Sequence, residues 1–169
     1  GDVYKRQIDY TSYVNPFIGT DFTGNTYPGA QAPFGMVQLS PDNGLPGWDR
    51  ISGYFYPDST IAGFSHTHLS GTGAGDLYDI SFMPVTLPYK EAEAPLGIHS
   101  KFSHKDESAH AGYYQVRLTD YNINVELTAT ERCGIQRYTF PEAQSAIFLN
   151  LKTAMNWDFT TDSHIEVVD

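Results

Sequence analysis

Apolar and polar residues alternate with a period of two along much of this 169-residue chain. In the segment YYQVRLT, the residues Tyr114, Val116 and Leu118 fall on one side, and Ile123 and Val125 do the same in INVELTATE. This period places successive side chains on opposite faces, as in a half-buried β-strand. Only the residues DYN separate the two segments, so we expect an antiparallel hairpin.

Other short apolar segments also predict strands, whereas helical periodicity is scarce. Turn-forming stretches such as PDNGLPG, GTGAGD and TFPEAQ separate them. Helix is expected only at residues 106–110 and in a turn after Thr153. The strands are expected at residues 36–40, 53–56, 60–67, 79–85, 113–119, 123–131, 135–140 and 146–151. Many short strands without intervening helices indicate an all-β fold, an antiparallel β-sandwich.

The two ends of the chain differ from its middle. The first seven residues, GDVYKRQ, contain no apolar signal-peptide region and are unlike the residues after them, so residues 1–7 are expected to be a non-native extension. At the other end, SHIEVVD begins as a strand and is followed by no turn or cap. We therefore expect residues 8–169 to be one β-sandwich domain that is incomplete at its C-terminus.

Charge and composition exclude several classes of function. The net charge is −10, from 20 acidic and 10 basic residues, whereas nucleic-acid binding needs a basic face. No apolar run approaches the length of a membrane span. The single cysteine, Cys133, excludes a disulfide framework and a multi-cysteine zinc site, and we expect it to be a small buried side chain in a strand. The charge and composition do not exclude neutral ligands such as sugars.

The segment GFSHTHLSGTGAGD concentrates candidate chemistry. If residues 64–68 are extended, His66 and His68 point to the same face, as a chelating pair for a transition metal would. A third ligand is then needed, and Asp76 and Asp79 are candidates. Alternatively, the histidines form hydrogen bonds inside the wall of a polar pocket.

The glycines after the histidines favour a loop with unusual backbone angles. Gly71 and Gly73 can adopt positive φ, so the main-chain amides, with Ser70 and Thr72 beside them, can approach a ligand closely. The lysine of a phosphate-binding loop is absent. A tight turn between two strands would explain the same glycines.

The loop PGWDRISGYFY places Trp48 beside Asp49. An exposed aromatic ring can stack on the apolar face of a sugar while a neighbouring carboxylate bonds its hydroxyls. A tryptophan that only covers a loop is the alternative. Glycosidases generally need two carboxylates across the scissile bond, and no such pair can be nominated in this chain.

Several long motifs, taken in order, resemble the start of glycoside hydrolase family 92. They are VNPFIGT, YPGAQAPFGMVQLSPD, SGYFYPDSTIAGFSHTHLSGTGAGDLYDISFMPV, FSHKDESAHAGYYQVRL and VELTATERCGIQRYTF, and the resemblance runs from Tyr13 to the C-terminus. It implies an exported, exo-acting α-mannosidase that is calcium-dependent and inverting. It also implies an N-terminal β-sandwich followed by an (α/α)-barrel, absent here, which carries the catalytic carboxylates and most ligands of the Ca²⁺ ion.

For this chain, the resemblance implies loops that border a sugar pocket but no catalytic residue. Trp48 would line the subsite of the leaving sugar, and the histidine and glycine segment would border the mannose site. The expected substrate-binding residues are Trp48, Asp49, His66, His68, Ser70, Gly71, Thr72, Gly73 and Asp76. The expected partners are mannose-containing glycans and the missing catalytic domain, in a secreted or periplasmic enzyme. Calcium takes oxygen donors, so the histidines are not expected to be its ligands.

Two other functions remain open on the sequence. A stand-alone carbohydrate-binding β-sandwich would use Trp48 without any catalytic domain. A metal-binding β-sandwich would use His66 and His68 to hold a transition metal.

Overall fold

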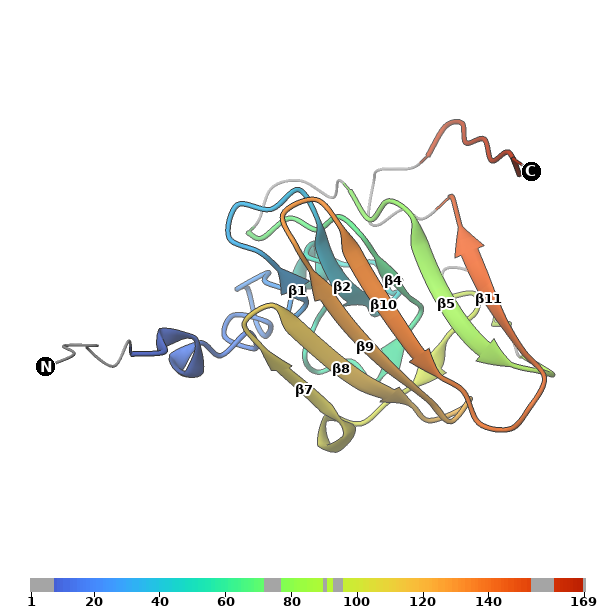
Figure 1. The fold of residues 1–169 in the computed structure, drawn as a ribbon, viewed down its shortest axis with the longest axis horizontal. Coiled ribbons are helices and arrows are strands. Elements are labelled where there is room, and N and C mark those ends of the chain that lie inside the picture. Colours follow the sequence, from blue (N-terminus) through green and yellow to red (C-terminus); the bar gives the residue numbers. More distant parts are fainter. Residues whose placement is uncertain (1–7, 72–76, 90, 93–95, 153–159, 169) are drawn as a thin grey trace, which may run out of the picture.

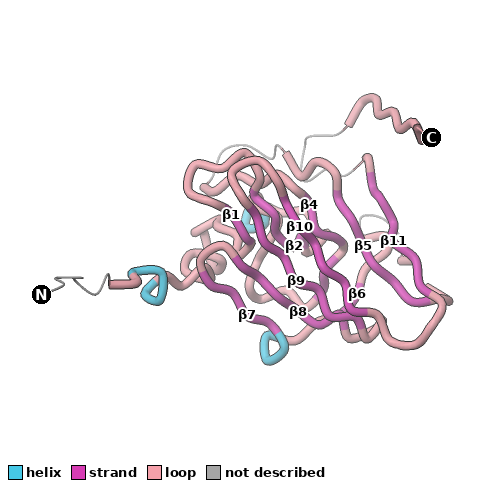
Figure 2. The backbone as a smooth tube through the Cα atoms, in the orientation of Figure 1, coloured by secondary structure: helices cyan, strands magenta, loops and turns pink. Residues whose placement is uncertain are grey.

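The computed structural model describes residues 8–71, 77–89, 91–92, 96–152 and 160–168. Nearly all of its regular structure is β-strand in antiparallel sheets, so the predicted all-β fold is confirmed (Figures 1 and 2). One sheet has the strand order β1-β2-β4-β5-β11, a second has the order β10-β9-β8-β7, and β3 pairs with β6. The strands are β1 (Ala30–Gln31), β2 (Gln38–Asp42), β3 (Thr60–Ile61), β4 (Gly63–Ser65), β5 (Ser81–Thr86), β6 (Ser100–Lys101), β7 (Glu107–His110), β8 (Tyr113–Leu118), β9 (Ile123–Ala129), β10 (Gly134–Thr139) and β11 (Ser145–Asn150).

The hydrophobic core lies between the five-stranded and the four-stranded sheet. Leu39 of β2, Phe64 of β4 and Val85 of β5 are fully buried in it. Val116 of β8 and Leu127 of β9 join the same cluster from the other sheet. Strand β9 contacts both β1 and β2, so the two sheets pack as the layers of a sandwich (Figure 1).

The predicted hairpin is formed by β8 and β9. The two strands are antiparallel, and Leu118 pairs with Ile123 beside the turn. Tyr114 and Val116 are buried while Gln115 between them is exposed. The period-two pattern therefore predicted correctly which side of this hairpin faces the core.

Three predicted elements differ from the structure. The helix predicted at residues 106–110 is wrong, because that segment is β7, which pairs with β8 after the short 3₁₀ turn η3 (His104–Asp106). No strand forms at residues 53–56, where Gly53 has a φ of +87°. The strand predicted at residues 60–67 is two strands in different sheets, which are separated at Ala62, whose N–H donates to the carbonyl of Asp42.

The expectations for Cys133 and for the C-terminal segment also differ from the structure. Cys133 is exposed in the turn between β9 and β10, where its carbonyl accepts a hydrogen bond from the N–H of Thr130, and it is not a buried strand residue. Residues 163–168 form no strand. The turn predicted after Thr153 falls outside the described residues.

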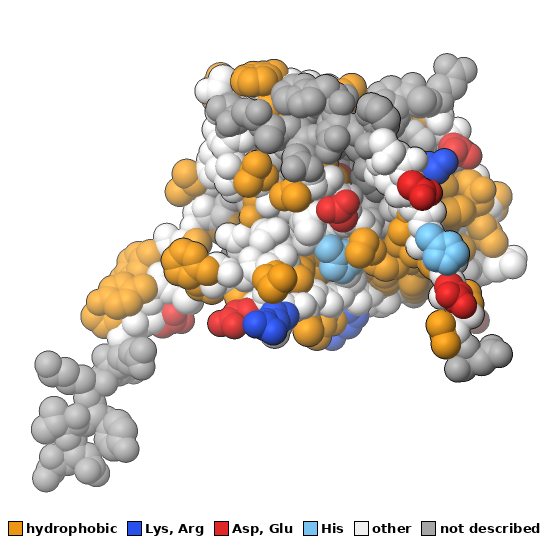
Figure 3. Space-filling view, turned by 90° about the horizontal axis from the view of Figure 1, so that it is seen from above, with side chains coloured by type: hydrophobic (Ala, Val, Ile, Leu, Met, Phe, Trp, Pro, Cys, Tyr) orange, Lys and Arg blue, Asp and Glu red, His pale blue; other side chains and the backbone are white. Residues whose placement is uncertain are grey.

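An exposed apolar segment leads into the sandwich from the N-terminal side. Ile8, Tyr10, Tyr13 and Val14 are each more than half exposed, and the 3₁₀ helix η1 (Tyr10–Tyr13) buries no residue. This segment extends away from the sheets in Figure 1, and hydrophobic side chains follow it in Figure 3. Among the described helices, none is long and apolar enough to cross a membrane.

Candidate functional site

His68 is the buried centre of the histidine segment. It is only 3% exposed. Its Nδ1 lies 2.7 Å from the carbonyl oxygen of Gln38, and its Nε2 lies 2.8 Å from Oδ1 of Asp42. The rings of Tyr27 and Tyr78 pack against the imidazole, with centroids 5.1 and 5.6 Å away. The imidazole is therefore part of the packed interior beside β2 and is closed to a ligand.

Both ring nitrogens of His68 face oxygen atoms that accept hydrogen bonds. A backbone carbonyl can only accept, so Nδ1 donates to Gln38. One proton is then held between Nε2 and the carboxylate of Asp42. The N–H of Ser65 donates to the other carboxylate oxygen of Asp42 at 3.2 Å. This buried pair has its partners satisfied and joins the end of β2 to the end of β4.

Gly53 connects this buried pair to the loop that carries Trp48. A Cβ atom added at Gly53 would lie 2.5 Å from Oδ1 of Asp42 and 3.1 Å from Cδ2 of His68. The φ of +87° also favours glycine at this position. The chain leaving the Trp48 loop therefore passes directly against the His68–Asp42 pair, which brings the two predicted stretches together.

Trp48 and Asp49 lie at the surface in one 3₁₀ turn, η2 (Trp48–Arg50). Trp48 is 54% exposed. The N–H of Arg50 donates to the carbonyl of Gly47 at 3.0 Å, which closes the turn. A half-exposed indole held on a closed turn can meet a flat apolar surface of a ligand.

His66 and His68 do not share hydrogen-bond partners. Strand β4 ends at Ser65, so the extended geometry that a chelating pair would need is absent, and that premise was wrong. Nδ1 of His66 lies 2.9 Å from the carbonyl oxygen of Ile80, and its ring meets Phe82 edge-on. The geometry instead matches the alternative to a metal site, in which each histidine forms its own hydrogen bonds within the protein.

Ser70, the residue before Gly71, borders a surface groove beside Tyr27. Ser70, Tyr27 and Gln31 line this groove, whose volume is about 590 Å³. Burial raises the pKa of the Tyr27 phenol, and a hydrogen bond with Ser70 opposes that rise. Gly71 has a φ of +99°, and its N–H donates to the carbonyl of Asn25 at 2.7 Å. The predicted glycine segment therefore begins at a groove that a small polar ligand could enter.

The remaining predicted binding residues, Thr72, Gly73 and Asp76, lie outside the described residues. Across the described part of the chain, no three histidine, cysteine, aspartate or glutamate side chains gather so as to hold a metal ion. Calcium takes six to eight oxygen ligands. The calcium ion, which the family resemblance assigns mainly to the (α/α)-barrel, therefore stays a prediction.

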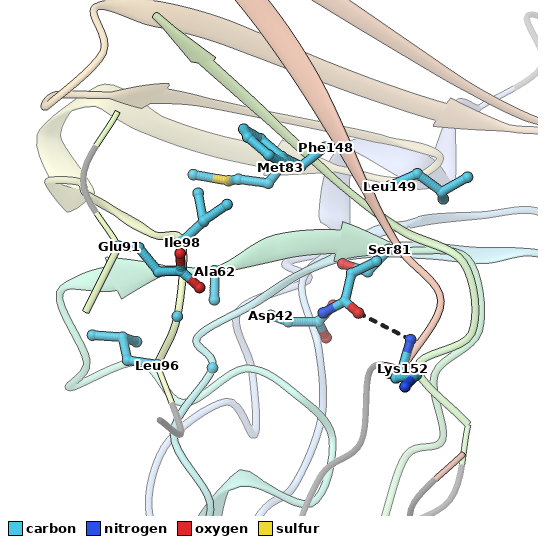
Figure 4. Close-up of a pocket in the computed structure, with 13 residues that line it drawn as sticks. Asp42, Ala62, Ser81, Met83, Glu91, Leu96, Ile98, Phe148, Leu149 and Lys152 are labelled. Atoms are coloured by element: carbon cyan, nitrogen blue, oxygen red, sulfur yellow. Dashed lines mark hydrogen bonds between the residues drawn. The ribbon is translucent and has the colours of Figure 1, made fainter. Parts of the chain in front are cut away.

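A second cavity lies between the end of β2 and strands β5 and β11 (Figure 4). Its volume is about 390 Å³. Asp42 and Ser81 contribute polar atoms to it, Phe148 contributes an apolar wall, and Glu91 and Lys152 lie on opposite sides in Figure 4. None of the predicted binding residues that the structure describes lines it. Of the predicted binding residues, Ser70 lines the Tyr27 groove instead.

Sequence reasoning missed the residues that hold these loops together. Gln38 and Asp42 lie in the motif YPGAQAPFGMVQLSPD, which carries part of the family resemblance but supplied no predicted site residue. The clue was an aspartate that ends an apolar strand, because a carboxylate there needs a buried partner. That partner, His68, lies 26 residues further along the chain.

Comparisons with known proteins show the family of the chain. Residues 13–169 match the profile described as the glycosyl hydrolase family 92 N-terminal domain. The chain is 44% identical to a family GH92 α-mannosidase from Bacteroides thetaiotaomicron, solved in complex with mannoimidazole, with a TM-score of 0.80 over 86% of this chain and 20% of that one. A second mannosidase of the family from the same organism, described as inverting, is 31% identical, with a TM-score of 0.67 over 85% of this chain and 20% of its own.

A curated fungal relative, from Arthroderma benhamiae, is described as an uncharacterized secreted glycosidase. It is 29% identical over 143 residues, which are 79% of this chain and 18% of the relative. The chain thus spans about a fifth of the length of the relatives it matches. Because the profile match covers nearly all of its residues, the chain belongs to glycoside hydrolase family 92, whose N-terminal domain it carries.

Proposed function

We propose that this chain is the N-terminal domain of an exported exo-α-mannosidase that removes terminal α-linked mannose from glycans. The 44% identity to an α-mannosidase that was solved with mannoimidazole supports the reaction and the substrate class. The inverting relative supports inversion, and the secreted relative supports export. In this proposal, an (α/α)-barrel elsewhere in the polypeptide supplies the two catalytic carboxylates and the ligands of a Ca²⁺ ion.

Two loops of the sandwich contact the sugar in this proposal. The indole of Trp48 stacks on the leaving sugar, and Asp49 beside it bonds a hydroxyl group. Ser70 borders the mannose unit from the groove beside Tyr27, and Gly71 contacts the same unit through its backbone. The observation that carries the proposal is the half-exposed Trp48 ring on a turn whose chain is packed against the buried His68–Asp42 pair.

The rest of the predicted set acts around those contacts. His68 is too buried to touch a sugar, so it acts by holding Asp42 and the chain at Gly53. His66 borders the mannose site in this proposal, and its hydrogen bond to the carbonyl of Ile80 fixes its ring. The roles implied for Thr72, Gly73 and Asp76 at the mannose site remain part of this proposal.

The test compares the full-length enzyme with this chain alone, using α-mannobiose as the substrate. The full-length enzyme is expected to release mannose and this chain alone to release none, because inversion needs two carboxylates across the scissile bond. Replacing Trp48 by alanine in the full-length enzyme is expected to lower kcat/KM by about tenfold, which corresponds to the stacking energy of one aromatic ring. Ile135→Ala, an exposed apolar position on β10, is the control and is expected to have no effect.

Two outcomes would contradict the proposal. One is release of mannose by this chain alone. The other is a Trp48→Ala enzyme that matches the control. Binding of methyl α-mannoside by this chain, with no hydrolysis by the full-length protein, would instead favour a stand-alone carbohydrate-binding module.

A further inference from the structure

Arg50 forms a bidentate ion pair with Asp58 at the base of the Trp48 loop. Its Nε lies 2.6 Å from Oδ2 of Asp58, and its Nη2 lies 2.6 Å from Oδ1. The two side chains are only 22% and 9% exposed. Two parallel charge-assisted hydrogen bonds fix the plane of a guanidinium as well as its position. Limited exposure also reduces the competition from water that weakens a fully exposed pair.

The same guanidinium makes two further contacts. Its central carbon lies 4.7 Å from the centroid of the Phe55 ring, within the range of a cation–π interaction. A Cβ atom added at Gly47 would lie 3.2 Å from Nη1 of Arg50, so the guanidinium covers the backbone of the residue just before Trp48. Arg50 is therefore held against both the entry of the loop and the turn after it.

Backbone hydrogen bonds show how short the connection to Trp48 is. The N–H of Arg50 donates to the carbonyl of Gly47, and the N–H of Gly53 donates to the carbonyl of Arg50. The N–H of Asp58 donates to the carbonyl of Phe55. Arg50 thus ties one closed turn, which carries Trp48, to another, which carries Asp58.

The geometry points to Arg50 and Asp58 as positioning residues that hold the Trp48 ring in the orientation that receives the leaving sugar. This inference rests on the function proposed for Trp48. Neither side chain needs to touch the sugar, because the pair acts through the backbone of the turn. Lysine cannot replace Arg50 fully, since an ammonium group has neither the planar fork nor the flat face that meets Phe55.

The test uses the full-length enzyme and two substrates. α-Mannobiose has a leaving sugar that reaches Trp48, whereas α-mannosyl fluoride has none. Arg50→Met and Asp58→Asn are each expected to lower kcat/KM on α-mannobiose by about tenfold, mainly through KM, and to leave the fluoride unchanged. Arg50→Lys is expected to lie between these variants and the parent enzyme.

The matched control is Arg137→Met. Arg137 makes an equally bidentate pair with Glu126, but it lies on β10 and its side chain is 71% exposed. This variant is expected to match the parent enzyme on both substrates. Equal losses on both substrates in the Arg50→Met and Asp58→Asn enzymes, or no loss in either, would overturn the inference.

A second measurement separates this inference from the proposed role of Trp48. The enzyme is labelled with 5-fluorotryptophan, and the Trp48 resonance is assigned by its absence in Trp48→Phe. The resonance is expected to shift or broaden in Arg50→Met without any sugar present. An unchanged resonance would overturn the positioning role even if Trp48→Ala shows the substrate effect. A changed resonance with an inert Trp48→Ala would instead refute only the role proposed for Trp48 in sugar binding.

Discussion

Nδ1 of His104 lies 2.7 Å from Oε2 of Glu107, a carboxylate whose side chain is only 1% exposed. The hydroxyl of Tyr114 donates to the same carboxylate at 2.6 Å, and the hydroxyl of Tyr54 donates to it at 3.0 Å. The buried charge is tolerated because three donors surround it. Glu107 thus joins β7 and β8 to the segment after the Trp48 loop.

Replacing Glu107 by glutamine should destabilise the domain. The amide carries one oxygen and one NH₂ group, so at least one of the donors now facing the carboxylate loses its acceptor. We expect a loss of about 2 kcal/mol in the free energy of unfolding, measured by denaturant titration. Glu126→Gln removes a partly exposed carboxylate from a pair whose arginine, Arg137, is 71% exposed, and should leave the unfolding midpoint unchanged. Equal midpoints for the two variants would contradict the role of Glu107.

Stability should fall at alkaline pH. Burial, and then the charge of Glu107, raise the pKa of Tyr54 and of Tyr114 well above the usual value for a phenol. The unfolded chain releases these protons near pH 10, roughly the pKa of an unperturbed tyrosine, whereas the folded chain keeps them. The stabilisation is therefore complete below about pH 10 and is lost as the pH rises further.

The measurement is a titration of tyrosinate absorbance together with circular dichroism. Ionisation of Tyr54 and Tyr114 is expected to coincide with loss of structure. The decline of stability with pH should be shallower in Tyr114→Phe, which has one fewer buried phenol. Complete ionisation of all tyrosines in a folded protein would refute the prediction.

The pattern of the sequence predicted some strands well and others badly, for physical reasons. Strands β8 and β9 were predicted because each has one buried and one exposed face. Strand β7, ESAH, was mistaken for a helix because its small and polar residues carry no apolar alternation, and pairing with β8 determines its conformation. The aromatic run at residues 53–56 resembled a strand, but Gly53 has a positive φ and Tyr54 is buried toward Glu107.

The candidate site divides in the same way. The exposure of Trp48 could be predicted, because a tryptophan within a proline- and glycine-rich loop rarely lies deep in a core. The partners of His68 could not be predicted, because Gln38 and Asp42 precede it by 30 and 26 residues. Only the antiparallel pairing of β2 with β4 brings them together.

Gly53→Ala should disrupt the contact between the Trp48 loop and the His68–Asp42 pair. The new methyl group would overlap Oδ1 of Asp42, and the φ of +87° is unfavourable for alanine. We expect a loss of about 3 kcal/mol, from backbone strain and overpacking together, measured by thermal denaturation. Gly112→Ala is the control, because Gly112 has a φ of +76° with open space at the Cβ position. It should lose only about 1 kcal/mol, and a similar loss in both variants would show that Gly53 is not crowded.

The two histidines of the HTH segment should respond very differently to alanine substitution. His68→Ala leaves the buried carboxylate of Asp42 without its main partner, so we expect a loss of about 3 kcal/mol. His66→Ala removes one hydrogen bond to the carbonyl of Ile80 at a partly exposed position, and a loss of about 1 kcal/mol or less is expected. Denaturant titration of the full-length enzyme, with its metal content measured alongside, distinguishes the two roles. A chelating pair would make the variants equivalent and remove a transition metal from both, because each histidine would supply one ligand to the same ion.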